Sequence, residues 1–98
     1  MQTRTAIEKI KARSEAIQSE GVKALYLYGS RARGTHRADS DLDVFVEYDP
    51  ASRFSLLNLA GVKLILEEAL GLEVHVTTRD SLHPELKAHI EGEAIRVL

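Results

Sequence analysis

Glycines divide this chain at the points where its hydrophobic pattern changes period, and this division constrains the fold more than any other feature of the sequence. In some segments apolar residues recur at helical spacing, whereas other segments are rich in β-branched and aromatic residues or alternate between apolar and polar. Because glycine adopts the positive φ at which helices commonly end, a glycine at a change of period predicts the end of an element. These ends are expected at Gly21, Gly29, Gly71 and Gly92.

The order of the segments predicts an α/β (α+β) fold in which helices pack against a mixed β-sheet. The link between the first two strands is too short for a full crossover, so we expect these two strands to run antiparallel. A chain of 98 residues has room for one core, which predicts a single domain over residues 1–98. The expected strands are 22–28, 40–47, 73–77 and an edge strand within 93–98; the expected helices are 4–20, one from Ser52 or Phe54 to Leu70, and one that Asp80 or Ser81 caps and that ends near Glu91.

Two helices allow more detailed expectations. Thr5 and Glu8 have the spacing of a capping box, which predicts how the first helix begins. In the second helix several large apolar side chains fall near one stripe, and we expect that stripe to belong to the core rather than to an interface. Its members are Leu56, Leu57, Leu64 and Ile65.

The composition excludes several classes of protein. The absence of cysteine excludes disulfide scaffolds, thiolate metal sites and cysteine nucleophiles, and it fits the reducing cytoplasm in which we expect the protein. Thirteen Lys and Arg against fifteen Asp and Glu give a net charge of -2, so we expect no general attraction to nucleic acids or anionic lipids. The longest mostly apolar stretch, residues 54–66, is too short to span a membrane.

The segment from Gly29 to Gly34 has the properties of an anion site. A glycine directly after a strand lets backbone amides approach a ligand closely. If Ser30 begins a helical turn, its hydroxyl and the free N–H groups of that turn point the same way. Arg31 and Arg33 add donors that suit phosphate oxygens. The same segment also fits an ordinary turn with Ser30 as the helix cap.

Asp41 and Asp43 stand two residues apart on the second predicted strand. Alternate residues of a strand share a face, so the two carboxylates are expected about 6 to 7 Å apart at their Cα atoms. Like charges at that separation repel each other unless a cation lies between them. Oxygen ligands on a rigid strand suit Mg²⁺, which keeps positions open for substrate phosphates. By itself this pair also fits two solvated aspartates.

Taken together, the two motifs resemble the signature of the DNA polymerase beta-type nucleotidyltransferase superfamily. The signature consists of Gly-Ser-x-Ala-Arg-Gly followed by Ser-Asp-x-Asp on the next strand. The run GSRARGTHRADSDLDVFVE resembles the minimal members of that superfamily, the MNT antitoxins of HEPN/MNT toxin–antitoxin pairs. The similarity continues through Leu70-Gly71 and the C-terminal half, so it covers nearly the whole chain.

The resemblance implies a fold, an activity and a set of site residues. The fold is the nucleotidyltransferase fold, and the activity is transfer of AMP from ATP, or of another nucleotide from its triphosphate, to a hydroxyl of a partner HEPN toxin. The divalent metal is expected to be Mg²⁺, with Mn²⁺ as the alternative. The role of Arg33 stays open between phosphate contact and bracing of the loop. The implied residues are Gly29 and Ser30, with Arg31 and Arg33, for the nucleotide, and Asp41 and Asp43 for the metal and catalysis.

His75 departs from the family pattern. The family has a third carboxylate on the next strand, and His75 occupies that position here. Three interpretations stay open: the imidazole ligates a metal or acts as general base; Glu73, on the same face, reaches into the site; or the chemistry has been lost. His75 is therefore a candidate catalytic residue, and the alternative function is an antitoxin that neutralises its partner by binding only. If catalysis persists, we expect it to be weaker or to use Mn²⁺ more readily than Mg²⁺.

Overall fold

Four strands form one mixed sheet in the computed structural model, which describes residues 2–34 and 41–98. The strand order is β3-β2-β1-β4; β1 is antiparallel to β2 and to β4, whereas β2 and β3 are parallel. The predicted mixed sheet and the predicted antiparallel pair are thus confirmed. The elements are α1 (Thr3–Lys11), α2 (Ser14–Ser19), β1 (Val22–Tyr28), α3 (Ser30–Arg33), β2 (Leu42–Tyr48), α4 (Leu56–Leu70), β3 (Val74–Thr78), the 3₁₀ helix η1 (Arg79–Ser81), α5 (Pro84–Glu93) and β4 (Ile95–Arg96).

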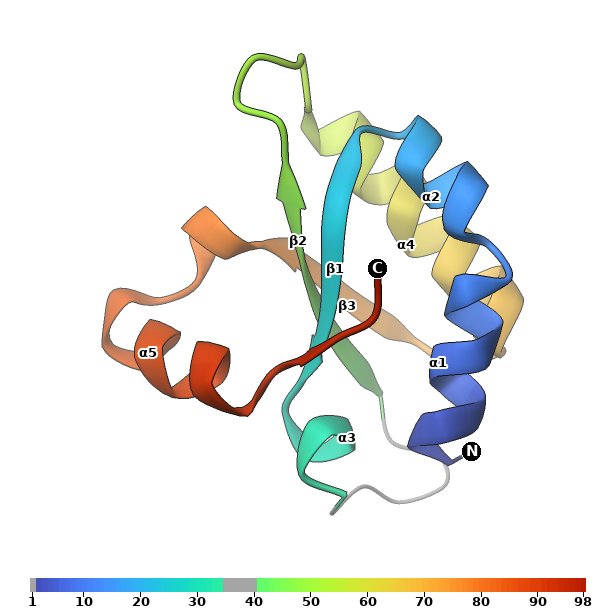
Figure 1. The fold of residues 1–98 in the computed structure, drawn as a ribbon. Helices are drawn as coiled ribbons and strands as arrows, with labels where there is room; N and C mark the ends of the chain where they lie inside the picture. Colours follow the sequence, from blue (N-terminus) through green and yellow to red (C-terminus); the bar gives the residue numbers. More distant parts are fainter. Residues whose placement is uncertain (1, 35–40) are drawn as a thin grey trace.

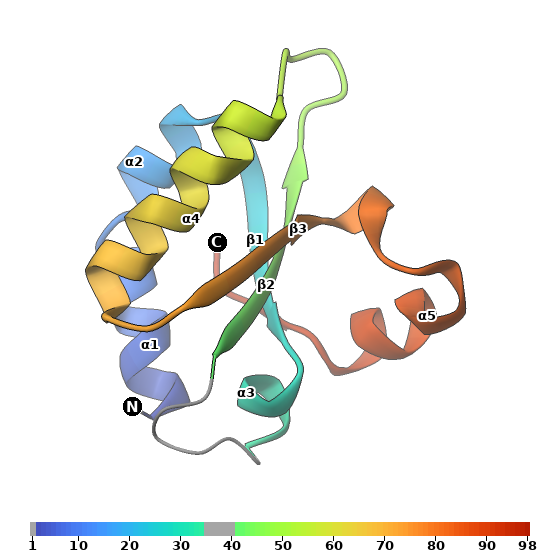
Figure 2. The same ribbon diagram turned by 180° about the vertical axis from the view of Figure 1, so that it is seen from behind.

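Helices α1, α2 and α4 lie together on one side of the sheet, and α5 lies on the other side (Figures 1 and 2). The core fills the space between the sheet and the layer of α1, α2 and α4. Alternation along the strands directs Leu42, Val44 and Val46 of β2 into that core, where none of them is exposed. The intervening residues of β2 therefore point to the opposite face, which we call the site face. No helix among the described residues has the length and apolar character to cross a membrane.

The first predicted helix is in fact two helices, and its predicted cap is wrong. The backbone leaves helical geometry at Arg13, which has φ -109° and ψ 15°, so α1 and α2 are separate. No glycine or proline marks this break in the sequence. Helix α1 begins at Thr3, and the side chain of the preceding residue, Gln2, makes no capping hydrogen bond. The capping box in the structure is at α4 instead, where Ser55 and Asn58 bond reciprocally.

The expected core stripe of α4 is also wrong in part. Leu56, Leu57 and Leu64 are 82%, 85% and 67% exposed. The helix instead buries Val62, Leu66 and Leu70, at spacing i, i+4, i+8, against the sheet. Ile65 is partly buried against the core. Helix α4 ends as predicted at Gly71, whose φ of 65° is the left-handed conformation of a helix C-cap.

The C-terminal region differs from expectation in its caps. Asp80 and Ser81 lie within η1, and the His83 side chain caps α5 by accepting a bond from the Glu85 N–H. Helix α5 continues through Gly92 to Glu93, so this glycine does not end it. The predicted edge strand is confirmed, since Ile95–Arg96 pairs with β1 at the edge of the sheet.

Candidate active site

The Gly29 corner lies directly against one of the predicted aspartates. Gly29 follows β1 with φ +74°, and its carbonyl accepts the Arg33 N–H as α3 begins at Ser30. A Cβ at Gly29 would lie 2.8 Å from Asp43 Oδ2, closer than carbon and oxygen normally approach. Both the dihedral and the close contact therefore require glycine. The structure brings together the Gly-Ser corner and the aspartate strand, as the motif predicts.

The strand register places four polar side chains on the site face where β2 and β3 begin. Asp43 pairs with His75 across the parallel strands, and the Leu42 N–H bonds the Glu73 carbonyl at 3.0 Å. Alternation then puts Asp41 and Asp43 beside Glu73 and His75. Within this group His75 Nε2 lies 2.9 Å from Asp41 Oδ2, a hydrogen bond when that nitrogen is protonated.

The two aspartates have different surroundings. Asp43 is half-buried against Gly29, whereas Asp41 is exposed and faces His75. Three potential ligand atoms lie within 4.8 Å of one another, and they come from Asp41, Glu73 and His75. Two ligands of one ion with bonds near 2.1 Å are about 3 to 4.2 Å apart, so a group spread over at most 4.8 Å is close to the size that a divalent cation needs. The predicted ligand Asp43 is not in this group; Glu73 is.

Burial and hydrogen bonding shift the pKa values of two groups in this cluster. Burial raises the pKa of Asp43, and the Asp41 carboxylate adds to the increase, whereas His75 and Arg33 oppose it. The hydrogen bond to Asp41 raises the pKa of His75 above its ordinary value, although desolvation opposes that shift. Asp43 and His75 thus both hold a proton more tightly than usual, and a bound cation would compete with those protons.

Of the two arginines in the motif, Arg33 has a described side-chain contact. The Arg33 guanidinium donates from one nitrogen to both carboxylate oxygens of Glu93, at 3.0 and 3.3 Å, and so connects α3 to the end of α5. This contact matches the bracing role that the sequence left open for Arg33. The backbone of Arg31 is part of α3, while its side chain is outside the described part of the structure.

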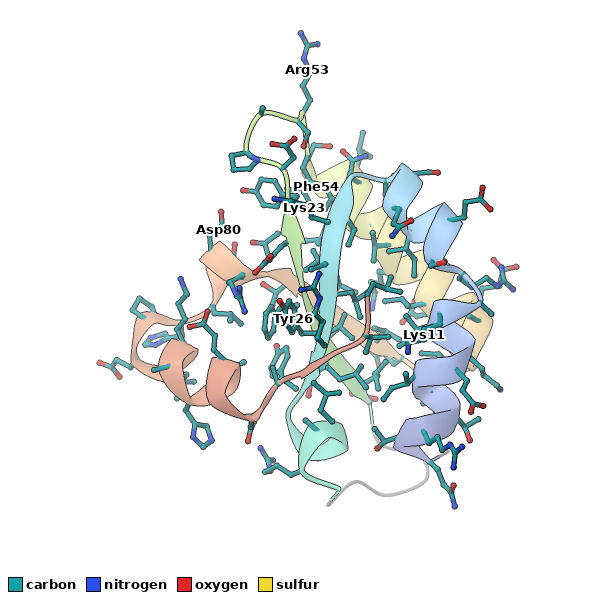
Figure 3. All side chains as sticks on the ribbon, in the orientation of Figure 1. Lys11, Lys23, Tyr26, Arg53, Phe54 and Asp80 are labelled. Carbon is teal, nitrogen blue, oxygen red and sulfur yellow. The ribbon has the colours of Figure 1, made fainter. Side chains whose placement is uncertain are left out.

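An aromatic stack next to the aspartates was not foreseen as a unit. Tyr26 and Phe45 are cross-strand partners, and their rings stack at 4.7 Å (Tyr26 in Figure 3). The Arg79 guanidinium lies over both rings and pairs with Glu47 and Glu91. The signal in the sequence was the position of Tyr26 and Phe45 on the same face of predicted neighbouring strands. This stack covers the centre of the site face.

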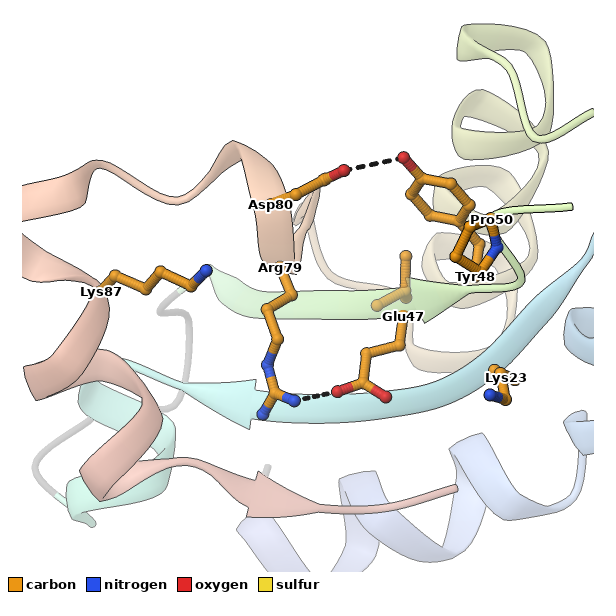
Figure 4. Close-up of a pocket in the computed structure, with 8 residues that line it drawn as sticks. Lys23, Glu47, Tyr48, Pro50, Arg79, Asp80 and Lys87 are labelled. Atoms are coloured by element: carbon orange, nitrogen blue, oxygen red, sulfur yellow. Dashed lines mark hydrogen bonds and ion pairs between the residues drawn. The ribbon is translucent and has the colours of Figure 1, made fainter.

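A cavity of about 460 Å³ lies beyond the stack. Its lining includes Glu47 and Tyr48 from the end of β2, together with Arg79, Asp80 and Lys87, as Figure 4 shows. Tyr48 donates its hydroxyl hydrogen to Asp80 at the rim, at 2.8 Å. Because Asp41 and Asp43 lie at the beginning of β2, the cavity is separate from the aspartate cluster.

Comparison with known proteins now shows the family. The model of the nucleotidyltransferase domain family matches residues 7–97, and this chain belongs to that family. A relative from Methanocaldococcus jannaschii, named "putative protein adenylyltransferase", is 46% identical over 78 residues, which are 80% of this chain and 82% of the relative. The resemblance seen in the Gly-Ser and Asp-x-Asp motifs is thus confirmed.

Solved structures show the same fold. A structure described as a "putative minimal nucleotidyltransferase" has 36% identity and a TM-score of 0.74, and the match covers 97% of this chain and 95% of that chain. An MNT antitoxin, solved in complex with the tri-AMPylated HEPN toxin of Shewanella oneidensis, has 16% identity and a TM-score of 0.67, over 98% of this chain and 71% of that chain. The predicted nucleotidyltransferase fold is confirmed.

Proposed function

We propose that this chain transfers AMP from ATP to a hydroxyl of an HEPN-type toxin and so acts as its antitoxin. The observation that supports this most directly is the packing of Asp43 against Gly29, because it joins a phosphate-binding corner to the acidic cluster. The name of the Methanocaldococcus relative and the AMPylated toxin in the Shewanella complex point to the same reaction and partner.

Each part of the site has a role in this reaction. Gly29 and Ser30 would hold the triphosphate through backbone N–H groups and the hydroxyl at the beginning of α3. Asp41 and Asp43 would hold the divalent metal, which supplies charge neutralisation and polarises the α-phosphorus when bound. The acceptor oxygen bonds to that phosphorus, its proton passes to a carboxylate oxygen of the site, and the bond to the departing pyrophosphate breaks. Catalysis of this kind rests mainly on positioning and charge, so few side chains are needed.

Incorporation of labelled AMP into a purified HEPN-type partner tests the proposal. We expect Asp41→Asn and Asp43→Asn each to reduce transfer at least 100-fold, because these substitutions remove charge at nearly constant shape. His83→Asn is the control, since His83 caps α5 outside the acidic cluster. Transfer at the normal rate by the Asp41→Asn, Asp43→Asn double variant would contradict the proposal.

The second candidate function is neutralisation by binding alone, and His75 in place of a carboxylate is the observation that favours it. An experiment in cells separates the two functions. If transfer is essential, the double aspartate variant fails to protect cells from the toxin when it is expressed at the level of the normal chain. If the double variant protects cells equally well, binding alone explains neutralisation.

A further inference from the structure

We propose that Asp41, Glu73 and His75 form a mixed nitrogen and oxygen metal site that prefers a first-row transition-metal dication, such as Mn²⁺, Co²⁺ or Zn²⁺, to Mg²⁺. The inference rests on the proposed function and makes it more specific, since it assigns the metal ligands and the class of ion. It adds Glu73 and His75 as ligands on the side of Asp41, and the role proposed for Asp43 beside Gly29 is unchanged.

The distances fit a single ion. The 2.9 Å between His75 Nε2 and Asp41 Oδ2 is close to the separation of two neighbouring ligands, about 3 Å at bonds near 2.1 Å. The Glu73 carboxylate lies within 4.8 Å of both other ligand atoms. The side chains of His75 and Asp41 are 52% and 49% exposed, so small rotations of exposed side chains suffice to close the ligand set.

The backbone beneath these ligands is fixed. Val74 lies between Glu73 and His75, and its side chain is completely buried in the core. Its carbonyl accepts a bond from Lys63 Nζ at 2.6 Å, and its N–H donates to Glu67 at 3.0 Å. Together with the Leu42–Glu73 bond, these contacts hold the beginning of β3 against both β2 and α4. A rigid backbone keeps the starting points of the ligand side chains fixed, so that only the side chains need to adjust when an ion binds.

The ligand types decide the class of ion. Two carboxylates supply the charge that balances a dication, and either would accept Mg²⁺. An imidazole nitrogen binds transition metals more favourably than it binds Mg²⁺, which prefers oxygen and keeps its water. Replacement of a third carboxylate by His75 therefore shifts the preference away from Mg²⁺.

Metal titration without nucleotide or partner tests the site. The chain, freed of any affinity tag and of metal, is titrated with Co²⁺ by visible absorption and with Zn²⁺ and Mg²⁺ by calorimetry. We expect the normal chain to bind Co²⁺ and Zn²⁺ at least 10-fold more tightly than Mg²⁺. His75→Asn and Glu73→Gln should each weaken Co²⁺ binding at least 10-fold. The matched control, His89→Asn, alters an exposed imidazole of α5 and should leave binding unchanged.

The variant His75→Asp tests the role of the nitrogen ligand in the choice of metal. It restores an oxygen ligand, so Mg²⁺ binding should strengthen while Co²⁺ binding weakens. Circular dichroism verifies that each variant is folded. Equal affinity of the normal chain for Co²⁺ and Mg²⁺, or unchanged Co²⁺ binding by His75→Asn or Glu73→Gln, would overturn the inference.

The titration distinguishes a failure of this inference from a failure of the proposed function. Because the titration contains neither ATP nor toxin, a chain that binds Co²⁺ through these residues but transfers no AMP supports the metal site and contradicts the transferase proposal. If the normal chain transfers AMP but His75→Asn still binds Co²⁺ normally, the transferase proposal is supported and the metal site is contradicted.

Discussion

Asp43 and Gly29 act as a unit at the scale of single residues. The carboxylate occupies the space that a side chain at position 29 would need, so the Gly-Ser corner packs directly against the strand that carries Asp43. Gly34 provides a natural comparison, because it has the same φ of +74°, but a Cβ at this position would meet no described atom within 4 Å. Alanine at Gly34 therefore measures the free-energy cost of the backbone conformation alone, whereas alanine at Gly29 adds the cost of displacing the Asp43 carboxylate.

We expect Gly34→Ala to lower the free energy of unfolding by about 1 to 2 kcal/mol, the ordinary cost of a left-handed alanine. Gly29→Ala should lower it further, because the new methyl group must also displace the Asp43 carboxylate. AMP transfer should fall at least 10-fold in Gly29→Ala and remain nearly normal in Gly34→Ala. Urea unfolding and the transfer assay measure both effects, and equal losses of activity in the two variants would show that Asp43 placement is not limiting.

The sequence was enough to select the residues of the candidate site, but not to predict how they group. Strand periodicity placed Asp41 and Asp43 on one face, and motif resemblance directed attention to His75. Periodicity does not say toward which neighbouring strand a side chain leans. The Asp43 carboxylate lies against Gly29 although the register pairs Asp43 with His75, and the His75 ring bonds Asp41 instead.

At the scale of elements, a polar contact attaches α4 to the beginning of β3. Glu67 accepts the Val74 N–H, and it also accepts a bond from Lys63, which donates to the Val74 carbonyl as well. The Val74 bond is the main reason why the pKa of Glu67 is lower than its ordinary value, and Lys63 lowers it further. The ionised carboxylate therefore stabilises the folded state.

Glu67→Gln should lower the melting temperature at pH 7, and the difference from the normal chain should depend on pH. A carboxyl with a lowered folded pKa stabilises the fold above its ordinary pKa of 4.5, and this contribution disappears as the pH falls through the folded value. Thermal unfolding between pH 7 and pH 3 should thus show the two melting temperatures converging. A constant difference over this range would mean that the charge of Glu67 does not contribute.

Most elements were predictable because glycines and changes of period marked their ends. Gly92 is a mark that failed, since it lies inside α5, and the other exceptions had no such mark. The break at Arg13 contains no glycine or proline, and Thr5 with Glu8 has the spacing of a capping box while lying inside α1. The cap of α5 is a histidine, a residue type that capping patterns do not single out.

At the scale of the whole molecule, the core and the proposed site occupy opposite faces of the sheet. The leucines exposed on α4 belong to the layer of helices on the core side. Sequence periodicity misassigned them because α4 is apolar around most of its circumference, so its pattern does not specify which side packs inward.

A pair of alanine variants tests this assignment. Leu64→Ala should change the free energy of unfolding by no more than about 0.5 kcal/mol, because its side chain is mostly in solvent. Leu66→Ala, two residues away and fully buried, should cost about 2 to 5 kcal/mol through lost burial and a cavity. Urea denaturation compares the two directly. A large loss for Leu64→Ala would mean that this leucine is covered in solution.

The short strand β4 has a consequence for work with this protein. The last residues complete one side of β1: Val97 donates its N–H to the Leu25 carbonyl, and Leu25 donates its N–H to Leu98. Removing residues 95–98 would leave unpaired backbone groups along β1, the kind of bare strand to which other chains add and then aggregate. Fusion partners and shortened versions should therefore leave these four positions intact.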